Sequence, residues 1–313
     1  MNIDFPNSRE KECLSAISKK QNFIMFLAMK IALVNPKIYD LFFQIYFEFR
    51  RLKNLKWGFF IPSPATIPHF LVIGFPKAGT TSMHEYLLQH PNIIGSWAKE
   101  THFFSYGYNK GLKFYFKFFK FNKNKNSLYF ESSPEYIYYI KALKRIKKLN
   151  PKMKLIVCLR NPIDLSFSSY NQLKNLGFET ESFEKVLLKE NYKLELHTKR
   201  LENDVYTAYN RPIFLPYLYI SEFVTYIKNT LDIFDKKNIF FVDSCDLKNN
   251  TQKTMNEIFE FLGLETHKIE ISLHNKSNYS GKLPLDIRKN LSKHFQPFNQ
   301  ELEKLLNKKF NWN

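Results

Sequence analysis

Cysteine and glycine are both scarce in this chain of 313 residues, which has three cysteines and nine glycines. The cysteines, at 13, 158 and 245, are odd in number and far apart, and no metal-ligand spacing surrounds them. The sequence therefore gives no sign of a zinc module, and a reducing compartment is the simplest setting for it.

Long hydrophobic runs are also missing. The most apolar stretch, "FIMFLAMKIALV" at 23–34, is short for a membrane span and is interrupted by Lys30. The residues before it are polar and carry no signal-peptide pattern. We expect residues 1–60 to form a helical N-terminal extension, either packed on the protein or bound to a membrane surface or partner.

Acidic residues are outnumbered, with 29 Asp and Glu against 47 Lys and Arg, so the formal net charge is +18. Such a surplus attracts nucleic acid, acidic polysaccharide, anionic membranes or a phosphate-rich cofactor. No RNP motif, zinc finger or basic zipper is visible, so we expect no nucleic-acid partner.

Three prolines in "IPSPATIP" predict a linker at 61–68, which leaves 69–313 as the main domain. Within it, apolar runs predict buried strands at 70–74, 154–159 and 238–243. Caps and periodicity predict helices at 80–89, 133–151, 161–177 and 251–264. Strands that alternate with helices predict an α/β fold with a central parallel sheet covered on both faces.

The first predicted strand runs into "GFPKAGTTS", which is close to a nucleotide-binding P-loop. Gly74 and Gly79 have the P-loop spacing, but Thr80 stands where the lysine is expected, and Lys77 lies inside the loop. Backbone N–H groups and the helix dipole make such a strand–turn–helix an anion site. A capped helix start with a solvated lysine and a Mg-dependent NTPase with Asp243 on the metal are the alternatives.

The segment after "VIGFP" resembles the 5′-phosphosulfate loop of sulfotransferases, which use 3′-phosphoadenosine 5′-phosphosulfate (PAPS) and have a P-loop-like, three-layer α/β/α fold. The resemblance implies that six residues bind the 5′-phosphate and sulfuryl group: Lys77, Ala78, Gly79, Thr80, Thr81 and Ser82. It also implies that Lys77 acts at the transferred group.

A second motif resembles the family's 3′-phosphate site. In "LIVCLRNPIDLSFSSYNQ", Arg160 ends a predicted strand and Ser168 follows eight residues later. Arginine grips phosphate with two parallel hydrogen bonds, and the serine adds a donor. A salt bridge at the strand end is the alternative for Arg160.

A third motif, "KETHFF" at 99–104, resembles the catalytic segment of carbohydrate sulfotransferases of the heparan sulfate type. The resemblance implies that Glu100 is the base that deprotonates the acceptor, with His102 assisting. A surface glutamate and a structural histidine are the alternatives. In "ESSPEY", Ser132 replaces a lysine of the heparan-type pattern, and we assign it no catalytic role.

Near the C-terminus, "HNKSNYSGK" resembles the loop that closes over the 3′ end of the nucleotide, which makes Lys276 and Lys282 candidate phosphate ligands or residues of a solvated loop. Together these motifs predict a PAPS-dependent sulfotransferase that needs no metal and acts on a hydroxyl of an acidic carbohydrate or glycolipid. We expect it in the cytoplasm, peripheral to the inner membrane face. A P-loop kinase or NTPase and a noncatalytic polyanion-binding protein with the same fold are the alternatives.

Overall fold

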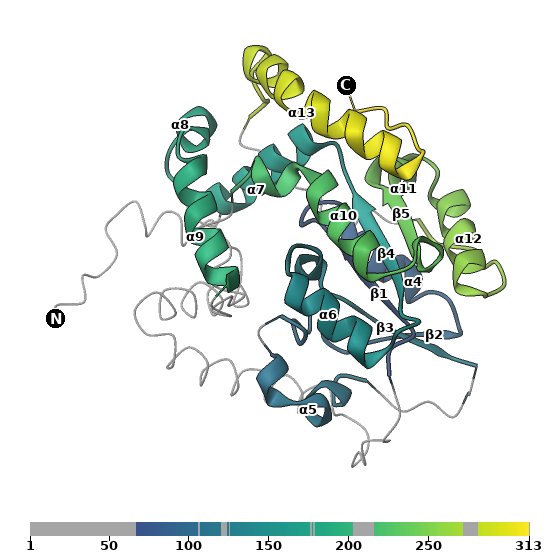
Figure 1. Cartoon of the computed structure of the whole chain (residues 1–313). Helices are drawn as coiled ribbons and strands as arrows, with labels where there is room; N and C mark the ends of the chain where they lie inside the picture. Colours follow the sequence, from purple (N-terminus) through teal and green to yellow (C-terminus); the bar gives the residue numbers. More distant parts are fainter. Residues whose placement is uncertain are drawn as a thin grey trace.

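The computed structural model describes residues 67–105, 107–119, 124, 126–175, 177, 179–202, 216–271 and 281–312 (Figure 1). The predicted N-terminal extension and most of the predicted linker lie outside the described residues. Among the described helices, none is both long and apolar enough to cross a membrane.

A five-stranded sheet forms the centre of the described chain, and all of its strand pairs are parallel. The strands are β1 (Phe70–Gly74), β2 (Ile93–Gly95), β3 (Leu128–Ser132), β4 (Lys154–Leu159) and β5 (Ile239–Asp243). They lie in the order β2-β3-β1-β4-β5, so β1 has β3 on one side and β4 on the other. Every residue of β1 is buried, as expected for a parallel strand covered on both faces. The predicted α/β fold with a central parallel sheet is confirmed.

Helices cover both faces of this sheet (Figure 1). Their bounds are α4 (Thr80–Leu87), α5 (Leu112–Phe116), α6 (Ile140–Leu149), α7 (Pro162–Asn175), α8 (Phe183–Leu187), α9 (Glu190–Glu202), α10 (Phe223–Ile233), α11 (Ser244–Asn249), α12 (Thr251–Leu262) and α13 (Leu285–Leu306). Helices α6 and α10 pack together in front of the sheet, with α13 against α10. The turn after α4 lies against α12, where the ring of His90 packs on Phe259.

The four predicted helices differ from the structure at their ends. The helix that was predicted over 133–151 is divided into a 3-10 helix, η2 (Pro134–Tyr138), and α6, with Tyr139 extended between them. All five side chains of η2 are buried, and a surface α-helix cannot bury every side chain of a turn. The helices predicted over 80–89, 161–177 and 251–264 each end two residues earlier, at Leu87, Asn175 and Leu262. The strands β2 and β3 and the long helix α13 were not predicted.

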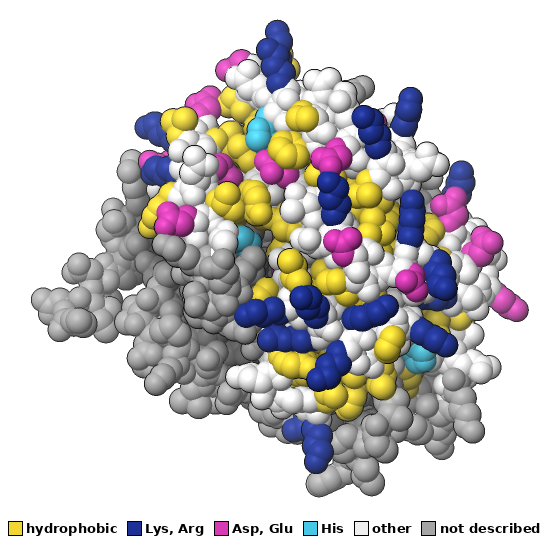
Figure 2. Space-filling view, in the orientation of Figure 1, with side chains coloured by type: hydrophobic (Ala, Val, Ile, Leu, Met, Phe, Trp, Pro, Cys, Tyr) yellow, Lys and Arg dark blue, Asp and Glu magenta, His cyan; other side chains and the backbone are white. Residues whose placement is uncertain are grey.

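Basic side chains are prominent on the face shown in Figure 2, where Lys and Arg gather in the region that α6 occupies in Figure 1. Lys141, Lys144 and Lys148 of α6 are exposed, while Leu143 and Ile146 on the opposite side of the helix are fully buried. The helix is therefore strongly amphipathic and presents positive charge to the solvent.

Candidate active site

The loop between β1 and α4 forms the first part of the site. Gly74 has a φ of 131°, and a Cβ atom there would lie 2.4 Å from the carbonyl oxygen of Cys158 on β4. Lys77 and Gly79 also have positive φ, 71° and 88°. Glycine adopts such angles without strain and lysine rarely does, so the loop at Lys77 is held in an uncommon conformation.

This loop delivers its hydroxyl groups and N–H groups to the start of α4. Ala78 is fully buried and Thr80 nearly so, while Thr81 and Ser82 are half-buried. Gly79 caps the helix without a side-chain hydrogen bond. The first N–H groups of a helix have no partner within the helix, so the loop can bind an anion as the sequence predicts.

Arg160 lies directly beside this loop. It follows β4, and its Nη1 donates a hydrogen bond of 2.9 Å to the carbonyl oxygen of Lys77. The contact brings the two motifs predicted to bind opposite ends of one nucleotide to the same edge of the sheet.

Helix α7 follows Arg160 and begins as predicted. The side chain of Asn161 accepts a hydrogen bond of 2.9 Å from the N–H of Ile163, and Asp164 lies in the first turn. Among the described residues, the buried hydroxyl groups of Ser168 and Ser169 have no hydrogen-bond partner. Buried hydroxyl groups are nearly always bonded, so these two fit a site whose partner is a ligand such as phosphate.

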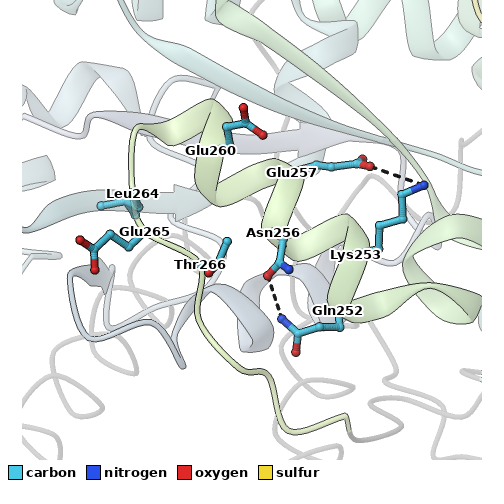
Figure 3. Close-up of a pocket in the computed structure, with 8 residues that line it drawn as sticks. All are labelled: Gln252, Lys253, Asn256, Glu257, Glu260, Leu264, Glu265 and Thr266. Atoms are coloured by element: carbon cyan, nitrogen blue, oxygen red, sulfur yellow. Dashed lines mark hydrogen bonds and ion pairs between the residues drawn. The ribbon is translucent and has the colours of Figure 1, made fainter.

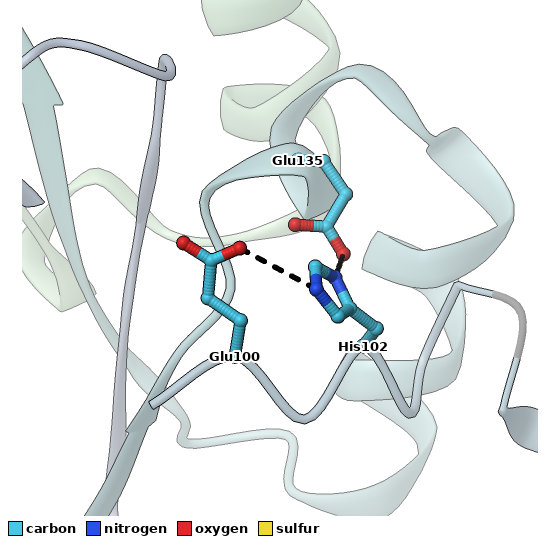
Figure 4. Close-up of side chains that lie close together, drawn as sticks. All are labelled: Glu100, His102 and Glu135. Atoms are coloured by element: carbon cyan, nitrogen blue, oxygen red, sulfur yellow. Dashed lines mark hydrogen bonds and ion pairs between the residues drawn. The ribbon is translucent and has the colours of Figure 1, made fainter. Parts of the chain in front are cut away.

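The predicted base lies in a chain of three ionisable side chains, Glu100, His102 and Glu135 (Figure 4). Nδ1 of His102 is 2.5 Å from Oε1 of Glu135, and its Nε2 is 3.4 Å from Oε2 of Glu100. Glu135 is fully buried, whereas Glu100 is 34% exposed and so accessible to an acceptor. Glu100 is thus a partly exposed carboxylate whose neighbour is an imidazole held by a second carboxylate.

The ligand atoms of these three residues lie within 4.8 Å of one another, a spacing that could also hold a metal ion. The sequence singled out Glu100 and His102 but missed Glu135. The sequence feature that could have pointed to Glu135 is its place one residue after Pro134 in the "ESSPEY" motif. Nothing in the linear sequence relates this carboxylate to His102.

A second buried carboxylate, Glu131 at the end of β3, supports this segment. It accepts hydrogen bonds from the hydroxyl groups of Thr101 (2.5 Å), Tyr115 (3.0 Å), Ser133 (2.8 Å) and Tyr136 (3.0 Å). Burial raises the pKa of Glu131, and the four hydroxyl donors oppose that shift. Because Thr101 lies between Glu100 and His102, the network fixes the backbone that carries both.

Ser132 lies beside Glu131 and is also fully buried. Its hydroxyl is 2.8 Å from Nδ1 of His84 on α4. Burial, with a smaller contribution from the charge of Lys99, lowers the pKa of His84 to about 4. His84 is therefore neutral at pH 7, and the Ser132–His84 pair brings no charge to the site.

Asp243, the residue that an NTPase would use to hold Mg²⁺, has other partners. Its Oδ1 accepts a hydrogen bond of 2.9 Å from the N–H of Cys245, and its Oδ2 accepts one of 2.8 Å from the indole of Trp312. Both oxygens are engaged in capping α11 and anchoring the C-terminal segment, which weakens the NTPase reading.

Of the two late lysines, Lys276 lies outside the described residues. Lys282 is exposed just before α13. Within the described ranges it makes no hydrogen bond or ion pair with another member of the predicted site.

A separate open hollow of about 660 Å³ lies along α12 and the segment after it (Figure 3). Nζ of Lys154, at the start of β4, donates to the carbonyl oxygen of Phe261 at the end of α12. The C-terminal end of α12 therefore lies at the amino end of β4, whereas Arg160 follows the other end of this strand. The lining of the hollow includes Glu257, Glu260 and Glu265, which do not suit an anionic nucleotide.

Comparison with known proteins agrees with this geometry. The family model described as "Sulfotransferase domain" matches residues 67–298, and the chain belongs to this family. The bifunctional heparan sulfate N-deacetylase/N-sulfotransferase 4 of Mus musculus is 29% identical over 230 residues, which cover 71% of this chain and 24% of that protein. The corresponding enzyme 3 of Homo sapiens is 27% identical, covering 77% of this chain and 30% of that protein.

Among solved structures, a sulfotransferase from Alicyclobacillus acidocaldarius superposes with a TM-score of 0.66 at 25% identity, covering 79% of this chain and 98% of that one. The predicted family and its three-layer α/β/α fold are therefore confirmed. The chain spans only 24% to 30% of the length of the two heparan sulfate enzymes.

Proposed function

We propose that this protein transfers the sulfuryl group of PAPS to a hydroxyl group of a carbohydrate or glycolipid. The observation that carries the proposal is the hydrogen bond from Arg160 to the Lys77 carbonyl oxygen. It joins the loop that would bind the 5′-phosphosulfate to the arginine that would bind the 3′-phosphate, so one nucleotide can reach both.

The residues of the loop would hold the donor through charge and hydrogen bonds. The N–H groups and hydroxyls of Thr80, Thr81 and Ser82 would bind the 5′-phosphate, and Lys77 would neutralise charge on the leaving phosphate oxygen. Arg160 and Ser168 would bind the 3′-phosphate and fix the orientation of the donor. The partnerless buried hydroxyl of Ser168 supports this role.

Glu100 would act as the base. The acceptor oxygen attacks sulfur, its O–H proton passes to Glu100, and the bond between sulfur and the phosphate oxygen breaks with its electron pair on that oxygen. His102, held by Glu135 at 2.5 Å, would orient the Glu100 carboxylate through its other ring nitrogen. A hydroxyl group stays protonated at neutral pH and therefore needs such a base during attack.

The acceptor class and the setting are further parts of the proposal. The named relatives act on heparan sulfate, which supports a carbohydrate. The exposed lysines of α6 suit an acidic chain or an anionic membrane surface. Among the described residues, Cys158 and the exposed Cys245 are free thiols, which supports a reducing location such as the cytoplasm.

The base assignment is tested with Glu100→Gln in a screen of labelled PAPS against glycans and lipid-linked glycans. We expect turnover to fall by about 10²–10⁴-fold, since the amide cannot accept the proton, while the affinity for 3′-phosphoadenosine 5′-phosphate (PAP) stays within about twofold. Glu257→Gln, on α12, is the matched control and should leave turnover and PAP affinity unchanged. Unaltered turnover in Glu100→Gln would show that the base is another group.

The donor assignment is tested by calorimetry with PAP and ADP. We expect PAP to bind the wild-type protein far more tightly, and Arg160→Met to remove most of that preference because the 3′-phosphate loses its charged partner. Equal affinities of the wild type for PAP and ADP would favour the kinase or NTPase alternative.

A further inference from the structure

Lys99, which the motif analysis assigned no role, lies at the candidate active site. Its Nζ is 2.8 Å from Oε1 of Glu100, and its side chain is 24% exposed. Its carbonyl oxygen accepts a hydrogen bond of 3.2 Å from the N–H of Ser132. The backbone of residue 99 is therefore docked on the carboxyl end of β3, next to β1.

The charge of Lys99 also affects the pKa values of two buried groups besides its contact with Glu100. Burial raises the pKa of the Cys158 thiol to about 12, and the Lys99 charge opposes this rise. The same charge contributes to the lowered pKa of His84 in α4. Cys158 is paired with Gly74, the residue from which the phosphosulfate loop departs. The ammonium group thus acts on the strand ends and the helix between which the loop lies.

One position beside the segment of Lys99 carries a cation in the heparan-type pattern but not in this chain. Ser132 stands where the heparan-type pattern has a lysine, and its hydroxyl is bonded to His84, which is neutral at pH 7. Lys77 is in the loop itself, and Arg160 donates a hydrogen bond to the backbone of that loop. The charge of Lys99 opposes the raised pKa of Cys158 on β4 and lowers the pKa of His84 on α4, where the Glu100 carboxylate acts in the opposite direction.

We propose that Lys99 is a second cation of the sulfuryl-transfer site, which exchanges Glu100 for the sulfuryl oxygens when the donor binds. This inference rests on the proposed function. In the ligand-free protein Lys99 and Glu100 are paired; when an anionic sulfuryl group enters, it competes for the ammonium and leaves a Glu100 oxygen available to the acceptor. The role of Lys99 is to stabilise charge on the sulfuryl oxygens.

The test compares Lys99→Gln with the wild type, using PAP, which lacks the sulfuryl group, and PAPS, which carries it. We expect Lys99→Gln to weaken PAPS binding by about tenfold in calorimetry and to leave PAP binding within about twofold, because only the sulfuryl contact is lost. Lys99→Arg should restore much of the PAPS affinity. Lys113→Gln, an exposed lysine on α5, is the matched control and should change neither affinity.

Equal changes in PAP and PAPS affinity, or none, in Lys99→Gln would overturn the proposal. A thermal unfolding curve for each variant separates these results from misfolding, and Lys99→Arg supplies a second variant that keeps the charge. Failure of the proposed function would look different: the wild-type protein itself would then show no preference for PAP over ADP.

Discussion

Replacing Gly74 with alanine should disturb the fold and the donor site together. The residue ends β1 with a φ of 131°, a region that residues with a side chain rarely occupy. An added Cβ would lie 2.4 Å from the carbonyl oxygen and 2.8 Å from the nitrogen of Cys158. Both atoms belong to the backbone of β4, so no side-chain rotation can relieve the contact.

The magnitude follows from two contributions to the free energy of unfolding. Holding alanine at this backbone conformation costs about 1–3 kcal/mol. Separating β1 from β4 to admit a methyl group costs about another 1–3 kcal/mol, as other overpacked interiors do. A total of about 4 kcal/mol is a large part of the roughly 5–15 kcal/mol by which a domain is stable.

Urea denaturation of the full chain measures this loss, and PAP calorimetry measures the site. Because the contact displaces the start of the loop relative to Arg160, PAP affinity should fall as well. Gly263→Ala is the matched control, since Gly263 also has a positive φ, 81°, but an added Cβ would meet nothing within 4 Å. If the two variants lose equal stability, the close approach of β1 and β4 is not what requires glycine at 74.

Two further predictions concern titratable groups away from the transfer site. Burial raises the pKa of Glu190 to about 7, although its carboxylate accepts hydrogen bonds from the N–H groups of Tyr217 and Leu218. The folded-state pKa of Glu190 lies above its unfolded-state value. The stabilisation of the fold by the protonated carboxyl group is therefore full below about pH 4.5 and is lost as the pH rises through about 7. In urea titrations, the free energy of unfolding of the wild type should decline by about 3 kcal/mol over that pH range, and Glu190→Gln should remove this decline. An unchanged pH profile in the variant would show that Glu190 is not its source. Burial raises the pKa of the Cys158 thiol to about 12, so this thiol is both inaccessible and protonated at pH 8. Alkylation at pH 8 followed by peptide mapping should therefore label the exposed Cys245 and leave Cys158 unlabelled in the folded protein. Rapid labelling of Cys158 would contradict this.

The strands that flank the site could be predicted because their signals are local. "FLVIG" and "KLIVCL" are continuous apolar runs that end at Gly74 and Arg160, and each is followed by a helix start with a recognisable cap or turn. The strand β2 is only three residues long, and β3 contains Glu131 and Ser132, so neither shows the apolar run of a buried strand. A charged residue inside β3 is tolerated because four hydroxyl groups satisfy it, and those donors come from three separate segments.

The motif that carries the candidate base could be recognised in the sequence, but the groups that position its side chains could not. Glu100 and His102 form part of a short motif, whereas Glu135 is 33 residues from His102 and contacts it only because η2 folds back over the 101–105 segment. Arg145 of α6 stabilises that fold by donating hydrogen bonds of 2.9 Å to the carbonyl oxygens of Phe104 and Ser105. Such contacts depend on the path of the chain, and no periodicity or spacing in the sequence encodes them.

The order of the strands explains why three motifs that are distant in sequence make one site. β1 lies between β3 and β4, and the chain moves first to one side of β1 and then to the other. Ligands of open parallel sheets bind at the carboxyl ends of the strands where the order reverses in this way. Each of the three strands brings one part: β1 leads into the predicted phosphosulfate loop, Arg160 directly follows β4, and the Ser132 N–H of β3 binds the carbonyl oxygen of Lys99, next to Glu100. A donor bound across β1 would therefore have its 3′-phosphate on the β4 side and its sulfuryl group on the β3 side, facing the base.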